Sequence, residues 1–450
     1  MTDSTYPGSL WQEAMTASGD ARGKRGKPDW TDIAFFVVLA LAAFYALTTY
    51  SDNMDYYEKL ILIGAVPSFS WMAWLWRPLR SLMIGAGLSA LLAIWLYSDG
   101  NNLLLGDITR ADSVFLLKYL LSSQSAILWM CALFVLATLF YWASYFSRTA
   151  GWLATGLTWA AVYFGTVGML VRWREGHLLG PGIGHIPVSN LYEVFVLFAL
   201  ITALFYLYYE RRYATRALGG FVLLVVSSAV IFLLWYSFTR DAYQIQPLVP
   251  ALKSWWMKLH VPANFIGYGT FSLAAMVGFA YLVKQHSQTR SWRALSPVFI
   301  LGAILCAEPF MFGSGQVSVT WMLYFGIGAV VVGIILALRG PIGAKLPSLE
   351  ILDDIMYRAI AVGFAFFTIA TVLGALWAAD AWGTYWQWDP KETWALIVWL
   401  NYAAWLHMRL IKGLRGTMAA YWALGGLLIT SFAFLGVNMF LSGLHSYGEL

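Results

Sequence analysis

Cysteine and charge are both scarce in this chain of 450 residues. It has only two cysteines, Cys131 and Cys306, and no C-x-x-C pair, which excludes a thioredoxin-like reductant and a protein that carries its own covalent haem. Charged residues make up 11% of the sequence, against about 25% in an ordinary soluble domain. With 60% hydrophobic residues, the chain cannot cover a water-facing surface, so lipid must surround most of it.

Several targeting and catalytic signatures are also missing. Residues 1–27 are polar and end in a basic run, without the apolar stretch that a cleaved signal peptide needs, so we predict a cytoplasmic tail. No H-E-x-x-H, G-x-S-x-G or paired-carboxylate arrangement occurs. The glycine-rich run 180–184 lacks the Gly-Lys-Ser/Thr ending of a phosphate-binding loop. The net charge of +5 is modest, so we attribute the basic residues to the orientation of the chain in the membrane rather than to nucleic-acid binding.

Long apolar runs are what the chain has in abundance. A span needs roughly 20 mostly apolar residues, and inside lipid each span must be helical because every backbone polar group has to pair internally. We therefore predict an all-α polytopic transmembrane helix bundle with about 13 spans, counted by the apolar-run rule. The expected spans lie near residues 31–50, 58–76, 81–97, 124–144, 152–171, 190–209, 217–238, 262–283, 295–312, 319–338, 357–378, 392–411 and 418–441.

The basic residues predict an orientation. When the spans are counted alternately, the clusters of Lys and Arg fall on one side, which the positive-inside rule assigns to the cytoplasm together with the N-terminus. An odd number of spans then puts the C-terminus on the outer side. Residues 1–110 are expected to form the tail and an N-terminal transmembrane block, and residues 111–450 the main domain. Arg172 and Arg174, on the outer side, are candidates for meeting an anion.

An outer loop, residues 380–394, is the most informative stretch. It carries four tryptophans between two expected spans. An interfacial aromatic belt explains one or two such rings, whereas a tight cluster of flat rings suits a flat, apolar, conjugated ligand. We therefore expect a ligand platform, with the belt as the alternative. The four residues are Trp382, Trp386, Trp388 and Trp394.

The residues from Asp389 to Glu392 fit a helix start. Asp at the N-cap, proline at N1 and Glu at N3 form a capping box, so we predict that Asp389 and Glu392 begin the next span. A ligand role for Lys391 stays open at this point. Asn190 and Glu193 have the same spacing and are predicted to start a span of their own.

Topology separates the six histidines. His260 lies just before one expected span and His445 just after the last, so both fall at the outer interface, where two imidazoles can take the axial positions of a haem iron. His407 lies roughly 25 Å along the helix from Pro390, at a depth where an ionisable residue is a functional candidate. The alternatives are ordinary interfacial or helix-end histidines. The remaining loop histidines, His177, His185 and His286, carry no such expectation.

Four segments resemble the CcsA/ResC family. The run from Trp382 to Glu392 is similar to the tryptophan-rich WWD signature of haem-handling proteins, and its continuation, residues 402–409, is similar to the CcsA/ResC branch. Segments 187–193, 259–261 and 443–448 are also similar to that branch and follow in the right order. The Lys-Glu after Asp-Pro and the terminal His-Ser-Tyr-Gly favour this branch over the system I relatives CcmC and CcmF.

The resemblance implies a role in system II cytochrome c maturation with a ResB/CcsB-type membrane subunit. Haem b would be moved to the outer face and joined through its vinyl groups to the thiols of an apocytochrome c C-x-x-C-H site, the chain being a subunit of a holocytochrome c synthase (haem lyase) complex. His260 and His445 would be outer axial ligands, and His407 an intramembrane ligand opposed by one from the partner. The loop residues Trp382, Trp386, Trp388, Asp389 and Trp394 would hold the haem.

Other features bear on location and on competing functions. The charged tail without a transit signature favours a bacterial inner membrane over a thylakoid. A membrane b-type haem electron-transfer protein would need histidine pairs on facing helices, and only His407 lies deep. A transporter of another solute would show broken helices and inverted repeats, neither of which is clear in the sequence.

Overall fold

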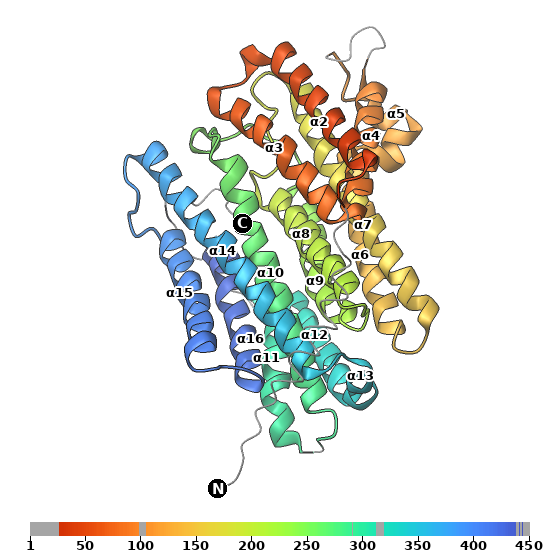
Figure 1. The fold of residues 1–450 in the computed structure, drawn as a ribbon, viewed down its shortest axis with the longest axis vertical. Helices are drawn as coiled ribbons and strands as arrows, with labels where there is room; N and C mark the ends of the chain where they lie inside the picture. The colour runs from red at the N-terminus through yellow and green to blue at the C-terminus, as the bar shows by residue number, and fades with distance from the viewer. Residues whose placement is uncertain are drawn as a thin grey trace. The chain divides into compact units, whose positions relative to one another are not determined.

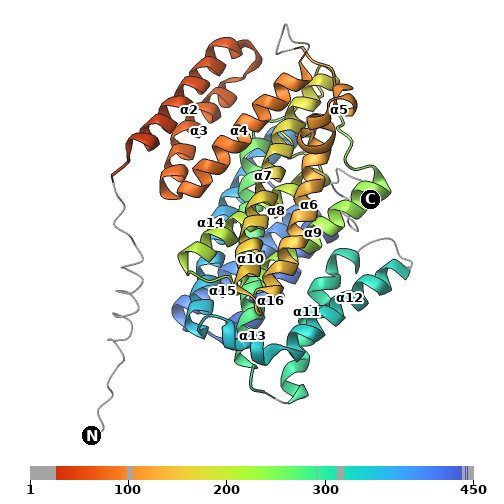
Figure 2. The same ribbon diagram turned by 90° about the vertical axis from the view of Figure 1, so that its right-hand side faces the viewer.

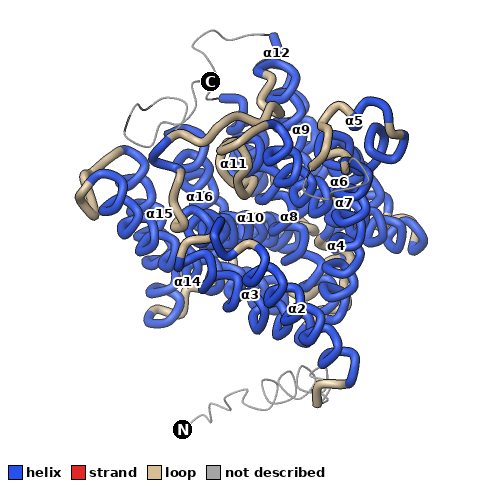
Figure 3. The backbone as a smooth tube through the Cα atoms, turned by 90° about the horizontal axis from the view of Figure 1, so that it is seen from above, coloured by secondary structure: helices blue, strands red, loops and turns tan. Residues whose placement is uncertain are grey.

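The computed structural model describes residues 27–98, 105–289, 291–311, 319–437, 441 and 443. Within these ranges every regular element is a helix, and no strand forms (Figure 3). In this part of the chain, nine helices are long and apolar enough to cross a membrane, or ten if a bent pair is one span. The predicted all-α polytopic membrane fold is therefore confirmed.

Each of the thirteen predicted runs overlaps a described helix, while the exact span count and the sides of the termini stay predictions. The nine membrane-crossing helices are α2 (Trp30–Thr49), α4 (Arg77–Tyr97), α6 (Ser123–Ala143), α7 (Arg148–Leu179), α8 (Leu191–Arg212), α9 (Gly219–Arg240), α10 (Met257–Gln285), α14 (Leu349–Trp382) and α16 (Thr417–Ser431) with its extension Phe432–Gly436. The other long helices are α3 (Tyr56–Leu75), α11 (Trp292–Met311), α12 (Val319–Ala337) and α15 (Pro390–Ile411).

The chain divides into two compact units, Met1–Gly85 and Ala86–Leu450. The boundary falls inside α4, earlier than the residue 110 expected from the sequence, and the division of roles between the two parts stays a prediction. In the first unit, Asp29 caps α2, and an ion pair joins Asp32 to Arg80 with 2.5 Å between carboxylate oxygen and guanidinium nitrogen. These contacts tie the start of α2 to the start of α4.

Helix α10 forms the core of the second unit. All of its residues from Gly267 to Val283 are buried, and it packs along α14, α16 and α8 (Figure 1). Small residues allow the close approach: a Cβ on Gly278 would meet the Ala420 carbonyl oxygen at 3.1 Å, and one on Gly267 would meet the Phe367 ring at 3.0 Å. Glycine and alanine are common at such contacts, because helices in lipid associate through close packing.

Helices α6 and α7 pack along each other at the edge of this unit (Figure 2). At the end of the bundle where α6 gives way to α7, buried Glu210 accepts hydrogen bonds from the hydroxyls of Tyr141 (2.6 Å) and Tyr206 (2.7 Å). At the same end, the Tyr213 hydroxyl donates to Asp354 (2.7 Å). These contacts join α6, the C-terminal end of α8 and α14.

The remaining elements are short. They are the π-helical turns Leu117–Leu121 and Phe432–Gly436, the 3-10 turns Ser51–Asn53 and Pro250–Leu252, and the helices α5 (Arg110–Ser113) and α13 (Arg339–Lys345). Segment Gly326–Ala337 of α12 and helix α13 meet at an angle of 68°.

Candidate functional site

A cavity opens at the end of the bundle where α8 and α15 begin and α14 ends. Its volume is about 270 Å³, far above the roughly 10–15 Å³ that one water needs. We call it the His260 cavity. Its aromatic lining consists of Tyr236, Phe265, Tyr268, Phe367, Trp377, Tyr385, Trp386 and Phe434. Its polar lining consists of Ser189, Asn190, His260, Asn264, Thr371, Lys391 and Glu392.

His260 lies in the first turn of α10, and its ring is oriented by α14. Its Nδ1 lies 2.8 Å from the carbonyl oxygen of Ala370. A carbonyl can only accept, so Nδ1 must be the protonated nitrogen and must donate this bond. In the neutral imidazole the lone pair then belongs to Nε2, the arrangement that suits a histidine ligand to a metal.

One face of α14 is shaped to receive the imidazole. A Cβ on Gly374 would meet His260 Cε1 at 2.8 Å and Nδ1 at 3.1 Å, so any side chain there would displace the ring. Trp377, one turn further on, meets the imidazole edge to face with ring centroids 5.7 Å apart. Its indole N–H donates to the Ala251 carbonyl (3.0 Å). Ala370, Gly374 and Trp377 therefore hold His260 in one orientation.

The four tryptophans of the loop at residues 380–394 lie in different environments. Of the four, only Trp386 lines the His260 cavity, beside Tyr385. Trp388 is 68% exposed, and its ring meets that of Trp386 edge to face at 6.0 Å. Trp382 ends α14, and Trp394 packs against Phe432 with ring centroids 4.3 Å apart. The structure thus does not gather the four rings into one flat layer.

Backbone conformation explains this spread. Gly383 has φ +80° and Trp388 has φ +58°, so the chain turns sharply at both ends of the segment between them. Glycine adopts this region without cost, whereas a bulky residue such as tryptophan is an outlier there. Strained residues of this kind gather at functional sites.

The capping prediction is confirmed. Asp389 and Glu392 form the reciprocal capping box at the start of α15, and Glu392 also accepts the backbone N–H of Gln387 (2.8 Å). Both carboxylates are buried, so they fix the loop rather than act as acid and base. Lys391, between them, lines the cavity, and its burial lowers the pKa of its ammonium group to about 8 against the attraction of Asp389.

His445 lies outside the described residues, but Gly443 does not. A Cβ added to Gly443 would clash with the Asp389 carboxylate and meet Pro390 Cδ at 3.1 Å. The backbone of Gly443 is therefore packed against the start of α15, next to the tryptophan-rich loop of residues 380–394. Only a glycine fits so close an approach.

His407 occupies a different setting. It lies on α15 with its side chain on the exposed face, as Leu400 and Ile411 do, and it is not among the residues that line the His260 cavity. The imidazole therefore lies outside the packed interior of this chain. The structure thus does not bring His407 and His260 together.

A buried ion pair lies at the start of α8. The Arg172 guanidinium lies 2.7 Å from a Glu193 carboxylate oxygen, with 3% and 1% of the two side chains exposed. Arg172 also donates to the backbone oxygens of Tyr243 (2.6 Å) and Gln244 (3.3 Å). The anion that Arg172 meets is therefore internal. The sequence signal for this contact was the predicted position of Arg172 on the outer side, where basic residues are disfavoured.

The loop histidines have structural contacts. His185 Nε2 lies 2.8 Å from the Ser189 hydroxyl and its Nδ1 lies 2.7 Å from the Ile183 carbonyl. The His177 ring packs against Gly184, leaving no room for a Cβ there. Among the residues that the structure describes, no three His, Cys, Asp or Glu side chains gather closely enough to hold a metal ion by themselves.

Several residues that line the cavity or hold His260 were not singled out from the sequence: Asn264, Ala370, Gly374, Trp377 and Tyr385. The only local signal is the helical spacing of Ala370, Gly374 and Trp377, which places them on one face of α14. Nothing in that spacing shows that the face meets His260.

Comparison with known proteins identifies the family. Residues 188–445 match the family described as "Cytochrome C assembly protein". The "Cytochrome c biogenesis protein CcsA" of Chlorella vulgaris is 33% identical over 321 residues, covering 70% of this chain and 93% of the relative. The protein of the same name from Synechocystis is 35% identical over 339 residues, covering 70% and 95%, and that of Guillardia theta is 34% identical over 287 residues, covering 63% and 82%. The chain therefore belongs to the cytochrome c assembly protein family and is a CcsA-type cytochrome c biogenesis protein.

Proposed function

We propose that this protein binds haem b in the His260 cavity and presents it for covalent attachment to apocytochrome c. The observation that carries this function is the pair of contacts that orient His260. The Ala370 carbonyl fixes its tautomer, and Gly374 leaves space for its ring. A histidine held in this way has Nε2 as the donor for an axial position of haem iron.

The lining of the cavity fits haem chemically. Eight aromatic residues contribute flat apolar surfaces, which suit a conjugated macrocycle. No cluster of protein donors in the described residues could hold a bare metal ion, whereas a haem brings four ligands in its own ring. Lys391 lies in the wall and supplies a cation for the carboxylates of the ligand.

His445 is the proposed second axial ligand. It follows Gly443 by two residues in the sequence, and Gly443 packs against Asp389 and Pro390 at the start of α15. Because two residues of chain span at most about 7 Å, His445 is within about that distance of Gly443. Trp382, Trp386, Trp388, Asp389 and Trp394 would hold and cover the ring.

The chemistry of attachment needs no oxidant. Each cysteine thiol of the C-x-x-C-H segment adds across a haem vinyl group, the sulfur bonding to one carbon and the proton going to the other. The protein's share is to bind and orient the haem, since aligning two reactants supplies much of the acceleration in such additions. This share makes the chain a subunit of a haem lyase.

His407 would act with a second membrane subunit of the ResB/CcsB type. Its side chain lies on the exposed face of α15, so a ligand opposite it must come from another chain. We place the complex in a bacterial inner membrane, where apocytochrome c would meet the His260 end.

Visible absorption of the purified protein tests this function. The chain would be prepared with and without its co-expressed partner, as the parent and as His260→Ala, His445→Ala and His407→Ala variants. His286→Ala serves as the matched control, because that histidine caps the far end of α10 and does not line the cavity. We expect a low-spin haem spectrum that His260→Ala and His445→Ala abolish or convert to high spin, and that His286→Ala preserves. Absence of haem from every preparation that contains the partner would refute the proposed function.

A further inference from the structure

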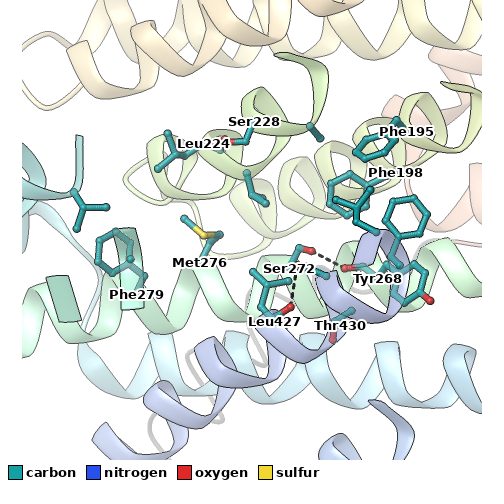
Figure 4. A pocket seen from close by; sticks show the side chains of 17 residues that line it. Phe195, Phe198, Leu224, Ser228, Tyr268, Ser272, Met276, Phe279, Leu427 and Thr430 are labelled. Carbon is teal, nitrogen blue, oxygen red and sulfur yellow. Dashed lines mark hydrogen bonds between the residues drawn. The ribbon is translucent and has the colours of Figure 1, made fainter. Parts of the chain in front are cut away.

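A second cavity lies in the same unit, deeper along α10 (Figure 4). Its volume is about 100 Å³, and we call it the Met276 cavity after a residue midway along α10. Side chains from α8, α9, α10 and α16 line it, with Gly302 of α11 and Val332 of α12 on one side. These linings are mainly apolar.

The hydroxyl groups in the Met276 cavity are already occupied. Those of Ser228, Ser272 and Thr430 donate to carbonyls one turn back in their own helices, at 3.0, 2.8 and 2.7 Å, and Ser431 does the same at 2.9 Å. A water in this space would find few partners, and apolar cavities of similar size stay dry and accept apolar groups. The Met276 cavity is therefore a space for hydrocarbon or aromatic atoms.

Two residues, Tyr268 and Phe434, line both cavities. The Phe434 ring packs against Phe195, Phe265 and Tyr268, with centroid distances of 5.3, 5.3 and 5.6 Å. These rings form the wall between the His260 cavity and the Met276 cavity.

The two shared residues differ in how firmly they are held. Tyr268 is itself buried and lies within the regular helix α10, between buried Gly267 and Gly269. Phe434 is half-buried and lies on the π-helical turn Phe432–Gly436. A π turn carries an extra residue, has a wider backbone and often marks a functional position. Of the two shared residues, Phe434 is thus the less buried one and the one on irregular backbone.

We infer that Phe434 is an adjustable wall that sets the size of ligand the His260 cavity accepts, and that the Met276 cavity is the space its ring enters when a large flat ligand binds. The resting His260 cavity, about 270 Å³, lies just below the roughly 300–1,000 Å³ usual for ligand pockets. An empty apolar cavity lowers the stability of the fold. Here it provides the space into which the Phe434 ring moves. The identity of the ligand as haem rests on the proposed function.

Filling the Met276 cavity from α9 tests this inference. Ser228→Leu adds apolar bulk to a cavity wall that does not touch the His260 cavity, whereas Ser228→Ala removes the same hydroxyl without adding bulk. We expect Ser228→Leu to lower the haem bound per chain roughly tenfold, because overpacking opposes entry of the ring, while Ser228→Ala behaves as the parent. The thermal unfolding temperature of Ser228→Leu should equal or exceed that of Ser228→Ala, since filling a cavity stabilises the fold.

Two further variants keep the outcome decisive. Ser272→Leu fills the same cavity from α10, with Ser272→Ala as its control, and should repeat the result if Ser228→Leu folds poorly. Phe434→Leu removes the ring, so adding it to Ser228→Leu should restore haem to at least half the parental level. Equal haem content in the Leu and Ala variants, or no recovery in the double variant, would overturn the inference.

A measurement without haem separates this inference from the proposed function. With 4-fluorophenylalanine at position 434, the fluorine resonance of Ser228→Ala should broaden or split on cooling, as exchange of the ring between two environments becomes slow. That of Ser228→Leu should stay a single sharp line. If no variant holds haem but the two lines differ in this way, the adjustable wall stands and the haem function falls. Identical fluorine lines in both variants would contradict the wall itself.

Discussion

The two ends of the helical bundle hold their ion pairs differently. At the His260 end, Arg172 and Glu193 are almost fully buried, with 3% and 1% of their side chains exposed. At the opposite end, Arg409 and Asp353 form a bidentate pair with distances of 2.9 and 2.6 Å but keep 11% and 13% exposed. Burying charge completely is costly unless the partner and further hydrogen bonds are in place. The His260 end is therefore organised in advance by internal contacts.

The histidines of the two ends follow the same division. His260 has a fixed tautomer and a glycine that makes room for its ring, all from the same chain. His407 lies on an exposed face, so its surroundings depend on lipid or a partner. The comparison indicates that the orientation of His260 is set within its own chain, whereas for His407 a second subunit is our proposal.

Breaking the buried pair is the strongest way to disturb the His260 end. Arg172→Gln leaves Glu193 buried without its cation, and such a loss costs about 3–5 kcal/mol. We expect a large fall in the thermal unfolding temperature of the detergent-solubilised protein. Arg409→Gln, the matched change at the other end, should cost clearly less because that pair is partly accessible. Equal losses from the two variants would remove the contrast between the ends.

Gly374 controls whether His260 can take its orientation. A methyl group in Gly374→Ala would meet the imidazole at 2.8 Å, so the ring must move away from the Ala370 carbonyl. We expect the affinity for haem to fall roughly tenfold, about 1.4 kcal/mol of binding free energy, measured by haem titration followed by visible absorption.

The matched control is Gly425→Ala. A Cβ on Gly425, in α16, would meet nothing within 4 Å, and alanine in a helix interior is favoured over glycine by roughly 0.5–1 kcal/mol. This variant should keep its haem and be slightly more stable. Haem retained by Gly374→Ala would show that the oriented tautomer does not matter for binding.

Lys391 gives the His260 end a pH dependence. Its pKa is about 8 in the folded protein, below the ordinary value of 10.5. Between these two values the unfolded chain binds more protons than the folded chain, so stability should rise with pH across this window. Lys391→Met should remove this rise in a series of thermal unfolding curves. Lys412→Met, an exposed lysine after α15, should leave it unchanged, and a rise that survives Lys391→Met would assign it to another group.

Helix positions and the start of α15 were predictable because they depend on local patterns. Apolar runs of span length gave each long helix, and the Asp-Pro-Lys-Glu spacing gave the capping box at Asp389 and Glu392. His260 was predicted as a site residue from its position just before an expected span. What the local pattern does not contain is the contact between His260 and Ala370, which lie 110 residues apart and meet only because α10 packs on α14.

The loop shows the same limit on a smaller scale. Four tryptophans in thirteen residues suggested a single platform, but the positive φ angles of Gly383 and Trp388 direct the rings to different neighbours. Glycine at 383 is a recognisable signal for such a turn, whereas tryptophan at 388 is not. The place of Phe434 in the wall between the His260 cavity and the Met276 cavity depends on a π turn, which no hydrophobic periodicity predicts.

The smallest expected effect concerns Arg358 and Asp354 in α14, at the end of the bundle opposite His260. This i, i+4 pair has an N–O distance of 2.8 Å but 49% and 39% of the side chains exposed. Exposed helix pairs contribute only about 0.3–0.5 kcal/mol, so Arg358→Gln should barely change the unfolding temperature or the haem content. Asp354→Asn should cost somewhat more, because Asp354 also accepts the Tyr213 hydroxyl at 2.7 Å. A loss from Arg358→Gln as large as that from Arg172→Gln would mean that a partner or lipid headgroup buries the Arg358 side chain in the membrane. The ion pairs at the His260 end would then be buried by the chain itself, and those at the opposite end by a partner or lipid. The stabilities of the variants would have to be compared in the complex with a second subunit.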